Sequence, residues 1–312
     1  YTAKVREPIH GTFRDHDIYG PPPPSSGGIT LVQMLNMLAM FTLKRQGRFA
    51  TATLHQMLET MKRAYRDRAA HLGDADFVDI PEKLTSKAYA HKLVENIDKQ
   101  KATPSEDLAG EIKLAPEGDS TTHFSVIDAD GLAVSNTYTL EQSYGSRIVV
   151  RGAGFLLNNE MGDFNPRPGV TDRVGRIGTA ANLIAPGKRM LSSQCPTIVA
   201  ADGKPVLITG SPGGRTIINT VLCNVLNVVA FRMPLPEAIA AARMHHSWLP
   251  DVALLELGGE EPKEKTLAEL REMRHTIKDT TSLGNAHSIH VTEEDYHGVA
   301  DWRRFEAAAL GL

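Results

Sequence analysis

The chain lacks the cysteines of a disulfide scaffold and the long apolar run of a membrane anchor. Only two of its 312 residues are cysteines, Cys195 and Cys223, and both lie in apolar surroundings without a CxxC or a Cys/His spacing. Isolated cysteines of this kind are typical of buried, small apolar side chains, so we expect neither a disulfide nor a zinc site. No apolar run reaches the roughly 18 residues that a membrane-spanning helix requires.

An excess of charge of one sign is also lacking. The 34 basic and 37 acidic residues give a formal net charge of -3, which does not indicate nucleic acid or a membrane surface as a partner. His245 and His246 would point to opposite faces of a strand, and His287 and His290 lie in a strand-like stretch, so we expect no metal ion. The sequence begins at Tyr1 rather than at a methionine, and we expect a preceding segment, so a missing targeting signal carries no information.

What the sequence does contain is a helical first third that follows short extended pieces in residues 1–20. The stretch "YGPPPPSSGG" (19–28) joins four prolines to a Ser-Ser-Gly-Gly turn, which indicates an ordered entry into a helix rather than a flexible tether. The polar stretch 103–120 holds two prolines and has no clear period, so we expect an exposed loop. Apolar residues at helical spacing predict helices over 29–41, 51–70 and 81–101.

Beyond residue 121 the pattern changes to strands. The stretches "HFSVIDADGLAVSNTYTL" and "CPTIVAADGKPVLITG" alternate apolar and polar residues around an Asp-Gly pair, which predicts two β-hairpins. Consecutive hairpins favour an antiparallel sheet over β-α-β winding, and the segregated helices and strands predict a layered α/β sandwich. Further strands are predicted in "SRIVVRGAGFLL", "VALLELG" and "AHSIHVT", and further helices in "TIINTVLCNVLNVVAFRM", "LPEAIAAARM" and 266–274.

Three hydroxyl residues precede the first of these hairpins, in "DSTTHFSV". A threonine hydroxyl is a weak nucleophile until a base removes its proton, and an N-terminal threonine carries such a base in its own α-amino group, whose reference pKa is about 8. Cleavage of the Ser120–Thr121 bond would therefore make Thr121 a nucleophile. The alternative is an ordinary polar turn before a strand. His123 should point away from its neighbours on the strand, so we expect it to have a packing role.

A Gly-Gly turn stands between a predicted strand and a predicted helix in "TGSPGGRTI". Backbone N–H groups of Gly213 and Gly214 at the start of a helix can stabilise a developing oxyanion. An isolated Gly-Gly pair is more often simply a turn. No GK[ST] follows it, which argues against a nucleotide-binding loop.

Several long motifs, taken together, show a family resemblance. The stretches "TTHFSVIDADGLAVSNTYTL", "LLNNEMGDFN", "KRMLSSQCPTIV" and "GSPGGRTIINTVL" resemble the gamma-glutamyltranspeptidase family, as do "PPPPSSGG" and "MHHSWLPD". The resemblance implies the N-terminal nucleophile hydrolase fold, a four-layer αββα sandwich of antiparallel sheets that matures by self-cleavage. It also implies that residues 1–120 correspond to the mostly helical end of a large subunit and residues 121–312 to a small catalytic subunit, the two forming one domain.

The resemblance also implies catalytic roles for four positions. Thr121 matches the catalytic threonine, the first residue of the small subunit. Thr139 matches a second threonine that hydrogen-bonds the nucleophile, and Gly213 and Gly214 match the oxyanion-hole pair.

Further positions match the family's binding site for the glutamyl group. Ser192 and Ser193 match the hydroxyls that hold the α-carboxylate, whereas Glu160 and Asp163 match the acids that hold the α-amino group. Hydroxyl donors suit a carboxylate and acids suit an ammonium group. Many relatives carry asparagine where this chain has Glu141, so we assign Glu141 to the same binding site with altered specificity.

Two other departures from the family pattern leave alternatives open. The family's large subunit supplies an arginine for the substrate carboxylate from an N-terminal half that this chain lacks, and that half is an expected partner. Some relatives carry an aromatic lid residue where this chain has Val174. A related acylase acting on cephalosporin side chains or poly-γ-glutamate, or an inactive truncated or unprocessed fragment, therefore stay open beside the leading interpretation.

The leading interpretation is γ-glutamyl transfer or hydrolysis after cleavage before Thr121. The donor would be glutathione or another γ-glutamyl compound, and the acceptor an amino acid, a peptide or water. By resemblance, no cofactor is expected and the location is periplasmic or extracellular.

Overall fold

Strands from the beginning, the middle and the end of the chain pair into one six-stranded sheet. The strand order is β1-β2-β5-β6-β10-β11, and every pairing in it is antiparallel. Its strands are β1 (Ile9–Phe13), β2 (His16–Gly20), β5 (Thr197–Ala201), β6 (Lys204–Thr209), β10 (His287–Val291) and β11 (Tyr296–Ala300). This computed structural model describes residues 2–110, 112, 122–165, 168–169, 171, 177–257, 261–304 and 307–311.

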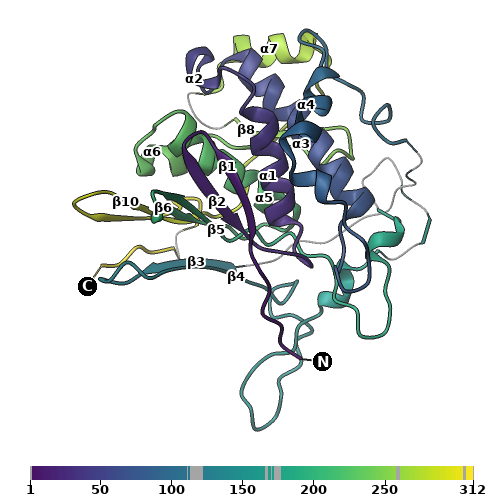
Figure 1. The fold of residues 1–312 in the computed structure, drawn as a ribbon, viewed down its shortest axis with the longest axis vertical. Helices are drawn as coiled ribbons and strands as arrows, with labels where there is room; N and C mark the ends of the chain where they lie inside the picture. Colours follow the sequence, from purple (N-terminus) through teal and green to yellow (C-terminus); the bar gives the residue numbers. More distant parts are fainter. Residues whose placement is uncertain are drawn as a thin grey trace.

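A layer of apolar helices covers one face of this sheet (Figure 1). Helix α1 (Gly27–Leu38) is buried along its whole length, and α5 (Ile217–Val225) likewise. A π-helical turn over Leu226–Ala230 extends α5. Helix α3 (Thr51–His71) packs against α1 and buries one apolar stripe of leucine, methionine and tyrosine. Apolar residues repeated at helical spacing thus place the core between the helices and the sheet.

A separate hairpin lies against the opposite face of the sheet. Strands β3 (Thr122–Ile127) and β4 (Ala133–Tyr138) pair with Thr122 opposite Tyr138. The hydroxyl of Ser125 donates to the carbonyl oxygen of His287 in β10, at 2.9 Å, which anchors the hairpin to the sheet. Helices, sheet and hairpin therefore form successive layers (Figure 1). The α/β sandwich of antiparallel sheets predicted from the sequence is confirmed.

The outer face of the hairpin carries apolar side chains that are open to solvent. Alternate residues of β3 and β4 point away from the six-stranded sheet, because side chains alternate between the two faces of a strand. They are Phe124 (48% exposed), Val126 (50%), Val134 (45%) and Tyr138 (56%). A row of this kind is typical of a surface that another element covers.

The remaining elements flank these layers. A third, three-stranded sheet joins β7 (Met244–His245), β8 (Ala253–Glu256) and β9 (Ile277–Thr280), and β8 and β9 form its parallel pair. The other helices are α2 (Leu43–Gln46), α4 (Lys87–Glu95), α6 (Leu235–Ala240) and α7 (Glu264–Glu272). Short 3-10 turns occupy Glu82–Thr85, Glu160–Asp163, Ala180–Asn182 and Gly214–Thr216.

Several element predictions need correction. The single helix expected over 81–101 is a 3-10 turn followed by the shorter α4, and the chain is extended at the Ser86 junction between them. Part of the stretch expected to be exposed is buried, because Ser105 accepts a hydrogen bond at 2.7 Å from the indole nitrogen of Trp248. The strand pair expected over 146–157 is a single isolated bridge between Val149 and Leu156, and β9 and β11 were not predicted.

Both cysteines are buried and unbonded to each other, as expected. Among the described residues, no helix combines the length and the apolar character that crossing a bilayer demands.

Candidate active site

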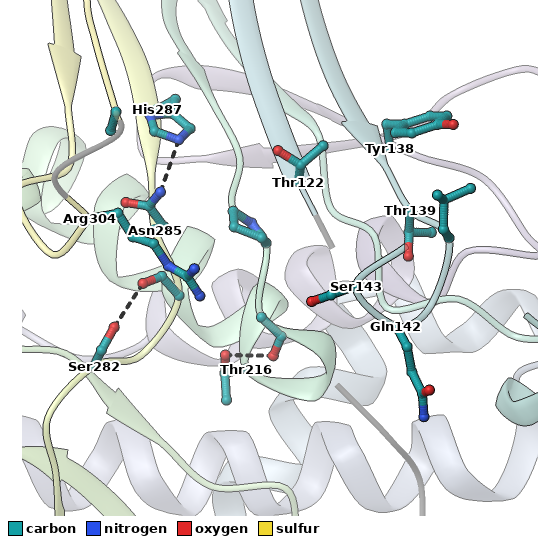
Figure 2. Close-up of a pocket in the computed structure, with 15 residues that line it drawn as sticks. Thr122, Tyr138, Thr139, Gln142, Ser143, Thr216, Ser282, Asn285, His287 and Arg304 are labelled. Atoms are coloured by element: carbon teal, nitrogen blue, oxygen red, sulfur yellow. Dashed lines mark hydrogen bonds between the residues drawn. The ribbon is translucent and has the colours of Figure 1, made fainter. Parts of the chain in front are cut away.

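A cavity of about 630 Å³ opens where the β3–β4 hairpin meets the ends of β6 and β10. Figure 2 shows Thr122 and Thr139 on one side of it, Asn285 and His287 on the other, and Thr216 at the start of the helical segment. The wall thus combines hydroxyl groups, backbone of a glycine turn and an imidazole. Its lining includes Thr122, Tyr138, Thr139, Gln142, Ser143, Pro212, Gly213, Thr216, Ser282, Gly284, Asn285, His287 and Arg304.

The Gly-Gly turn enters this cavity in a conformation that only glycine adopts freely. Gly213 has φ +133° and Gly214 has φ +54°, and both precede α5. A side chain on Gly213 would meet the Thr216 hydroxyl at 2.5 Å and the backbone of Gly284 at 3.3 Å. The first N–H groups of a helical segment have no acceptor within that segment, so they are available to a ligand oxyanion. Gly213 lines the cavity, and Gly214 follows it directly in the turn.

Thr139 lies at the end of β4 and lines the same cavity. Its hydroxyl oxygen accepts a hydrogen bond from the backbone N–H of Glu141 at 2.9 Å, which fixes the turn after the strand. Thr121 and the Ser120–Thr121 bond lie outside the described residues. Their neighbour Thr122 is exposed and lines the cavity.

A second group of predicted residues lies in the loop before β5. The hydroxyl of Ser193 accepts a hydrogen bond from Arg68 at 2.8 Å, and the same guanidinium donates to Ser26 at 2.9 Å. Ser26 in turn donates to the carbonyl oxygen of Ser192 at 2.7 Å. Arg68, on α3, is only 4% exposed, so it is a buried cation directly behind the two serines. Sequence reasoning missed Arg68, because nothing in the helical stripe of α3 distinguishes it from a surface arginine.

The predicted acids Glu160 and Asp163 form a 3-10 turn over Glu160–Asp163. Glu160 is 5% exposed, and neither carboxylate oxygen has a hydrogen-bond partner among the described residues. Asn182 connects this turn to the serine loop, because its amide donates to the Asp163 carbonyl at 2.7 Å and accepts from Leu191 N–H at 2.9 Å. A buried carboxylate without a cation is costly, which makes Glu160 a natural site for a ligand ammonium group.

Glu141 belongs to the same group of acids. It is 7% exposed, and its carboxylate fills the space that a side chain on Gly162 would need. Glu141 has φ +69°, an unusual value for a residue other than glycine. The chain therefore holds this acid beside the Glu160–Asp163 turn through local backbone geometry.

The catalytic and binding groups predicted from the sequence are thus connected but are not all in one cavity. Thr139 and Gly213 line the cavity, whereas the acids and serines lie outside its lining. Gln194 connects the two groups, because its amide donates to the carbonyl oxygen of Thr137 at 3.0 Å. The Val174 position of the expected lid lies outside the described residues.

One cluster elsewhere has the composition of a metal site. Ligand atoms of His55, Glu59 and His275 all lie within 4.8 Å of one another. However, both sides of the Glu59 carboxylate face cations, Lys62 at 3.4 Å and Arg63 at 2.6 Å. The imidazoles share a hydrogen bond of 2.8 Å, and burial lowers the pKa of His275 to about 3. The two imidazoles are hydrogen-bonded to each other, and the Glu59 carboxylate is already paired with two cations, so we assign no metal to this cluster.

The adjacent pair His245 and His246 does not form a joint site. His245 accepts a hydrogen bond from Asn219 at 2.8 Å, whereas His246 contacts Asp251 at 3.2 Å. His245 ends β7 and His246 follows the strand, so the two side chains reach different partners.

Comparison with known proteins gives results for the whole chain. The family model described as gamma-glutamyltranspeptidase matches residues 1–311. A protein named glutathione hydrolase proenzyme from Escherichia coli K12 is 44% identical over 314 residues, covering 100% of this chain and 53% of that protein. A protein named acylase ACY 1 proenzyme from Pseudomonas sp. strain SE83 is 33% identical, over 97% of this chain and 51% of that protein. The chain therefore spans about half the length of these curated relatives.

The fold is also similar to that of a solved structure. Gamma-glutamyltranspeptidase from Pseudomonas nitroreducens, complexed with L-DON, superimposes with a TM-score of 0.55 at 43% sequence identity. The superposition covers 62% of this chain and 98% of that chain.

Proposed function

This chain belongs to the gamma-glutamyltranspeptidase family, and we propose that it carries the catalytic part of an enzyme that transfers or hydrolyses γ-glutamyl groups. Glutathione and related γ-glutamyl amides would be the donors, and water, amino acids or peptides the acceptors. The observation that carries this proposal is the cavity that Thr139 and Gly213 line together. Thr122, which directly follows Thr121 in the sequence, lines the same cavity.

Maturation of the proposed enzyme begins at Thr121. Its hydroxyl oxygen attacks the carbonyl carbon of Ser120, and the peptide nitrogen leaves as the amine of Thr121, so that an ester replaces the amide. Water hydrolyses this ester, which releases the Ser120 carboxylate and leaves Thr121 with a free hydroxyl and a free α-amino group. The amine then serves as the general base, because its reference pKa of about 8 leaves part of it neutral near pH 7.

Catalysis uses the same hydroxyl on a donor amide. Thr121 Oγ attacks the γ-carbonyl carbon while the α-amino group takes the hydroxyl proton. The Gly213 and Gly214 N–H groups stabilise the oxyanion, and Thr139 orients the nucleophile. The leaving amine takes the proton, and a glutamyl ester stays on Thr121. Water or an acceptor amine then attacks this ester, which gives glutamate or a new γ-glutamyl amide and restores the hydroxyl.

Donor recognition is proposed for the loops beside the cavity. Ser192 and Ser193 would donate to the α-carboxylate, with Arg68 supplying positive charge from behind at 2.8 Å from the Ser193 hydroxyl. Glu160, buried without a partner in the described part of the chain, would take the α-ammonium group together with Asp163. A positive group for the α-carboxylate and acids for the α-ammonium group would together select a donor with an α-amino acid end.

A third acid narrows the choice of donor. Glu141 lies against Gly162 beside this ammonium site, where it favours a positive group and repels a second carboxylate. We therefore propose that Glu141 acts on the ammonium side of the donor site.

The proposal includes a partner for the hairpin surface. Residues 1–120 would correspond to the end of a large subunit and residues 121–312 to the small one. The N-terminal half of the relatives' length would cover the apolar outer face of β3–β4 and supply the arginine for the donor carboxylate. The exposed Phe124 and Tyr138 support this, because such a face is unstable in water. A periplasmic or extracellular location is part of the same proposal.

A related acylase is the second candidate. The 33% identity to the acylase ACY 1 proenzyme favours it, because both groups of relatives match nearly the whole chain. The two candidates differ in the donor, since an acylase for side chains without an α-amino acid end has no use for the buried Glu160.

The intact mass of the protein, expressed from its complete reading frame and followed over time, tests the proposal. We expect two pieces, the smaller beginning at Thr121, and release of anilide from a γ-glutamyl anilide by the cleaved form only. Thr121→Ala should stay uncleaved and inactive. An uncleaved wild-type protein without activity would exclude the proposed function, whereas a cleaved protein that acts only on acyl groups lacking an α-amino group would support the acylase.

A further inference from the structure

We propose that His123 is a positioning residue that fixes strand β3, and with it the nucleophile, relative to the oxyanion turn. The inference rests on the proposed function. Its ring, 3% exposed, lies between the hairpin and the six-stranded sheet. There it contacts residues from β3, β4 and the turn after β6. In the proposed function, β3 directly follows the nucleophile, and the turn after β6 leads to the oxyanion-binding glycines.

A closed chain of contacts connects these elements. His123 Nε2 lies 3.1 Å from the Ser125 hydroxyl, which donates to the carbonyl oxygen of His287 at 2.9 Å. The N–H of His287 donates to the carbonyl oxygen of Gly210 at 3.3 Å. Gly210 in turn lies directly against the His123 ring, which closes the circuit. A shift of any member therefore displaces strand and turn together.

The hydrogen bonds determine the state of the imidazole. The Ser125 hydroxyl gives its proton to the His287 carbonyl, so towards His123 it can only accept, and Nε2 must carry the hydrogen. Nδ1 of the neutral ring then accepts from the Thr137 hydroxyl at 2.9 Å. Burial, followed by repulsion from His287, lowers the pKa of His123 to about 3, which agrees with a ring that is neutral during turnover.

Gly210 is glycine because of this ring. A methyl group there would overlap three ring atoms of His123. The backbone of Gly210 does not lie in the left-handed region, so an alanine would meet no obstacle of its own conformation. Gly210 stands directly before Ser211, and the oxyanion turn with Gly213 follows. The contact between ring and glycine therefore sets how closely the nucleophile strand approaches that turn.

A double-substitution experiment tests this contact. Gly210→Ala should displace the ring and lower both the rate of cleavage before Thr121 and kcat by about 100-fold, because misplacement by about 1 Å costs about that factor. KM for the donor should stay within about threefold, since the donor-binding loops are not displaced. His123→Ala in the same chain opens the space and should restore at least about tenfold of the loss. A purely structural contact would change the melting temperature without this split between kcat and KM.

One spectroscopic measurement and two further variants complete the test. Nitrogen-15 spectra of the histidine rings should show His123 as the Nε2–H tautomer without titration down to about pH 4, because its pKa is about 3. His297→Ala, an exposed histidine on β11, is the matched control and should leave all rates unchanged. His123→Gln keeps a donor for Ser125 and should lose less activity than His123→Ala.

The outcomes separate this inference from the function on which it rests. An active wild type whose Gly210→Ala variant keeps its kcat, or whose loss His123→Ala does not relieve, overturns the positioning role alone. A ring that titrates near its usual pKa of about 6.5 also overturns it. A wild type without cleavage or γ-glutamyl transfer removes the proposed function, and the catalytic meaning of the contact with it.

Discussion

Neutralising Glu160 should strengthen the fold and weaken donor binding at once. In the free protein Glu160 is 5% exposed and its carboxylate finds no partner among the described residues, so the substitution Glu160→Gln removes a buried charge at constant volume. An unsatisfied buried polar group costs about 1–3 kcal/mol, and more for a charged group. Because 1 kcal/mol corresponds to about 2–4 °C for 150–250 residues and to less for a longer chain, the melting temperature should rise by a few degrees.

The same substitution should loosen the hold on an α-ammonium group. A hydrogen bond to a charged partner contributes about 1.5–3 kcal/mol, so the Kd of L-glutamate should increase by roughly 10- to 150-fold. Calorimetric titration with L-glutamate measures the affinity, and scanning calorimetry without ligand measures the stability. Glu272→Gln, on the exposed end of α7, is the matched control. A variant that melts lower than wild type, or that binds L-glutamate equally well, would refute this reasoning.

Three further predictions concern other parts of the site and its support. His245 has a pKa lowered to about 3 by burial and then by His246, Arg215 and Arg68, so the unfolded chain binds its proton near pH 6.5 and the folded one does not. Its contribution to stability is complete above pH 6.5 and is lost as the pH falls, at about 1.4 kcal/mol per pH unit. H245N should therefore reduce the pH dependence of the unfolding free energy, measured by urea unfolding from about pH 7 to 4, and an unchanged dependence would contradict this. Arg68→Met removes the guanidinium contacts to the Ser26 and Ser193 hydroxyls and should weaken L-glutamate binding at least about tenfold. Arg68→Lys keeps the charge but is too short to reach both hydroxyls, so its affinity should lie between those of Arg68→Met and the wild type. Equal L-glutamate affinity of the wild type and both variants would exclude this role. Gly213→Ala forces φ +133° on alanine and should lower kcat by more than about 100-fold, while the free energy of unfolding falls by only about 1–3 kcal/mol. A loss of stability without a loss of kcat would contradict an oxyanion role.

The periodic parts of the fold could be predicted from the sequence, because their signals are local. The alternation around Asp130–Gly131 and Asp202–Gly203 gave both hairpins, and the helical stripe from residue 51 gave α3. The helix expected over 81–101 failed at Ser86, where an extended residue caps α4 through a side-chain hydrogen bond to Tyr89. Capping of this kind competes with helix continuation, and an apolar stripe does not reveal it.

The candidate site was predicted only where motifs carry it. The Gly-Gly turn was singled out from its place between a strand and a helix, and Thr139 from the family resemblance; Thr139 and Gly213 line one cavity. Arg68 and Asn182 were missed, because no local pattern connects them to their partners. Those of Arg68 lie 42 and 125 residues away, and those of Asn182 lie 9 and 19 residues away. The buried state of Glu160 was equally hidden, since burial depends on how distant loops close over the 3-10 turn.

The pairing of the first strands with the middle of the chain has a consequence for the order in which the protein folds. During synthesis β1 and β2 leave the ribosome well before their sheet neighbour β5, and Ser26 must wait for Ser192, 166 residues further on. Loops of that length close slowly, and until then the apolar helices of the first third stay open to solvent. We therefore expect the newly made helical segment to depend on chaperones, and substitutions at the β2–β5 junction should lower the yield of folded protein in cells more than they change the stability of the folded state.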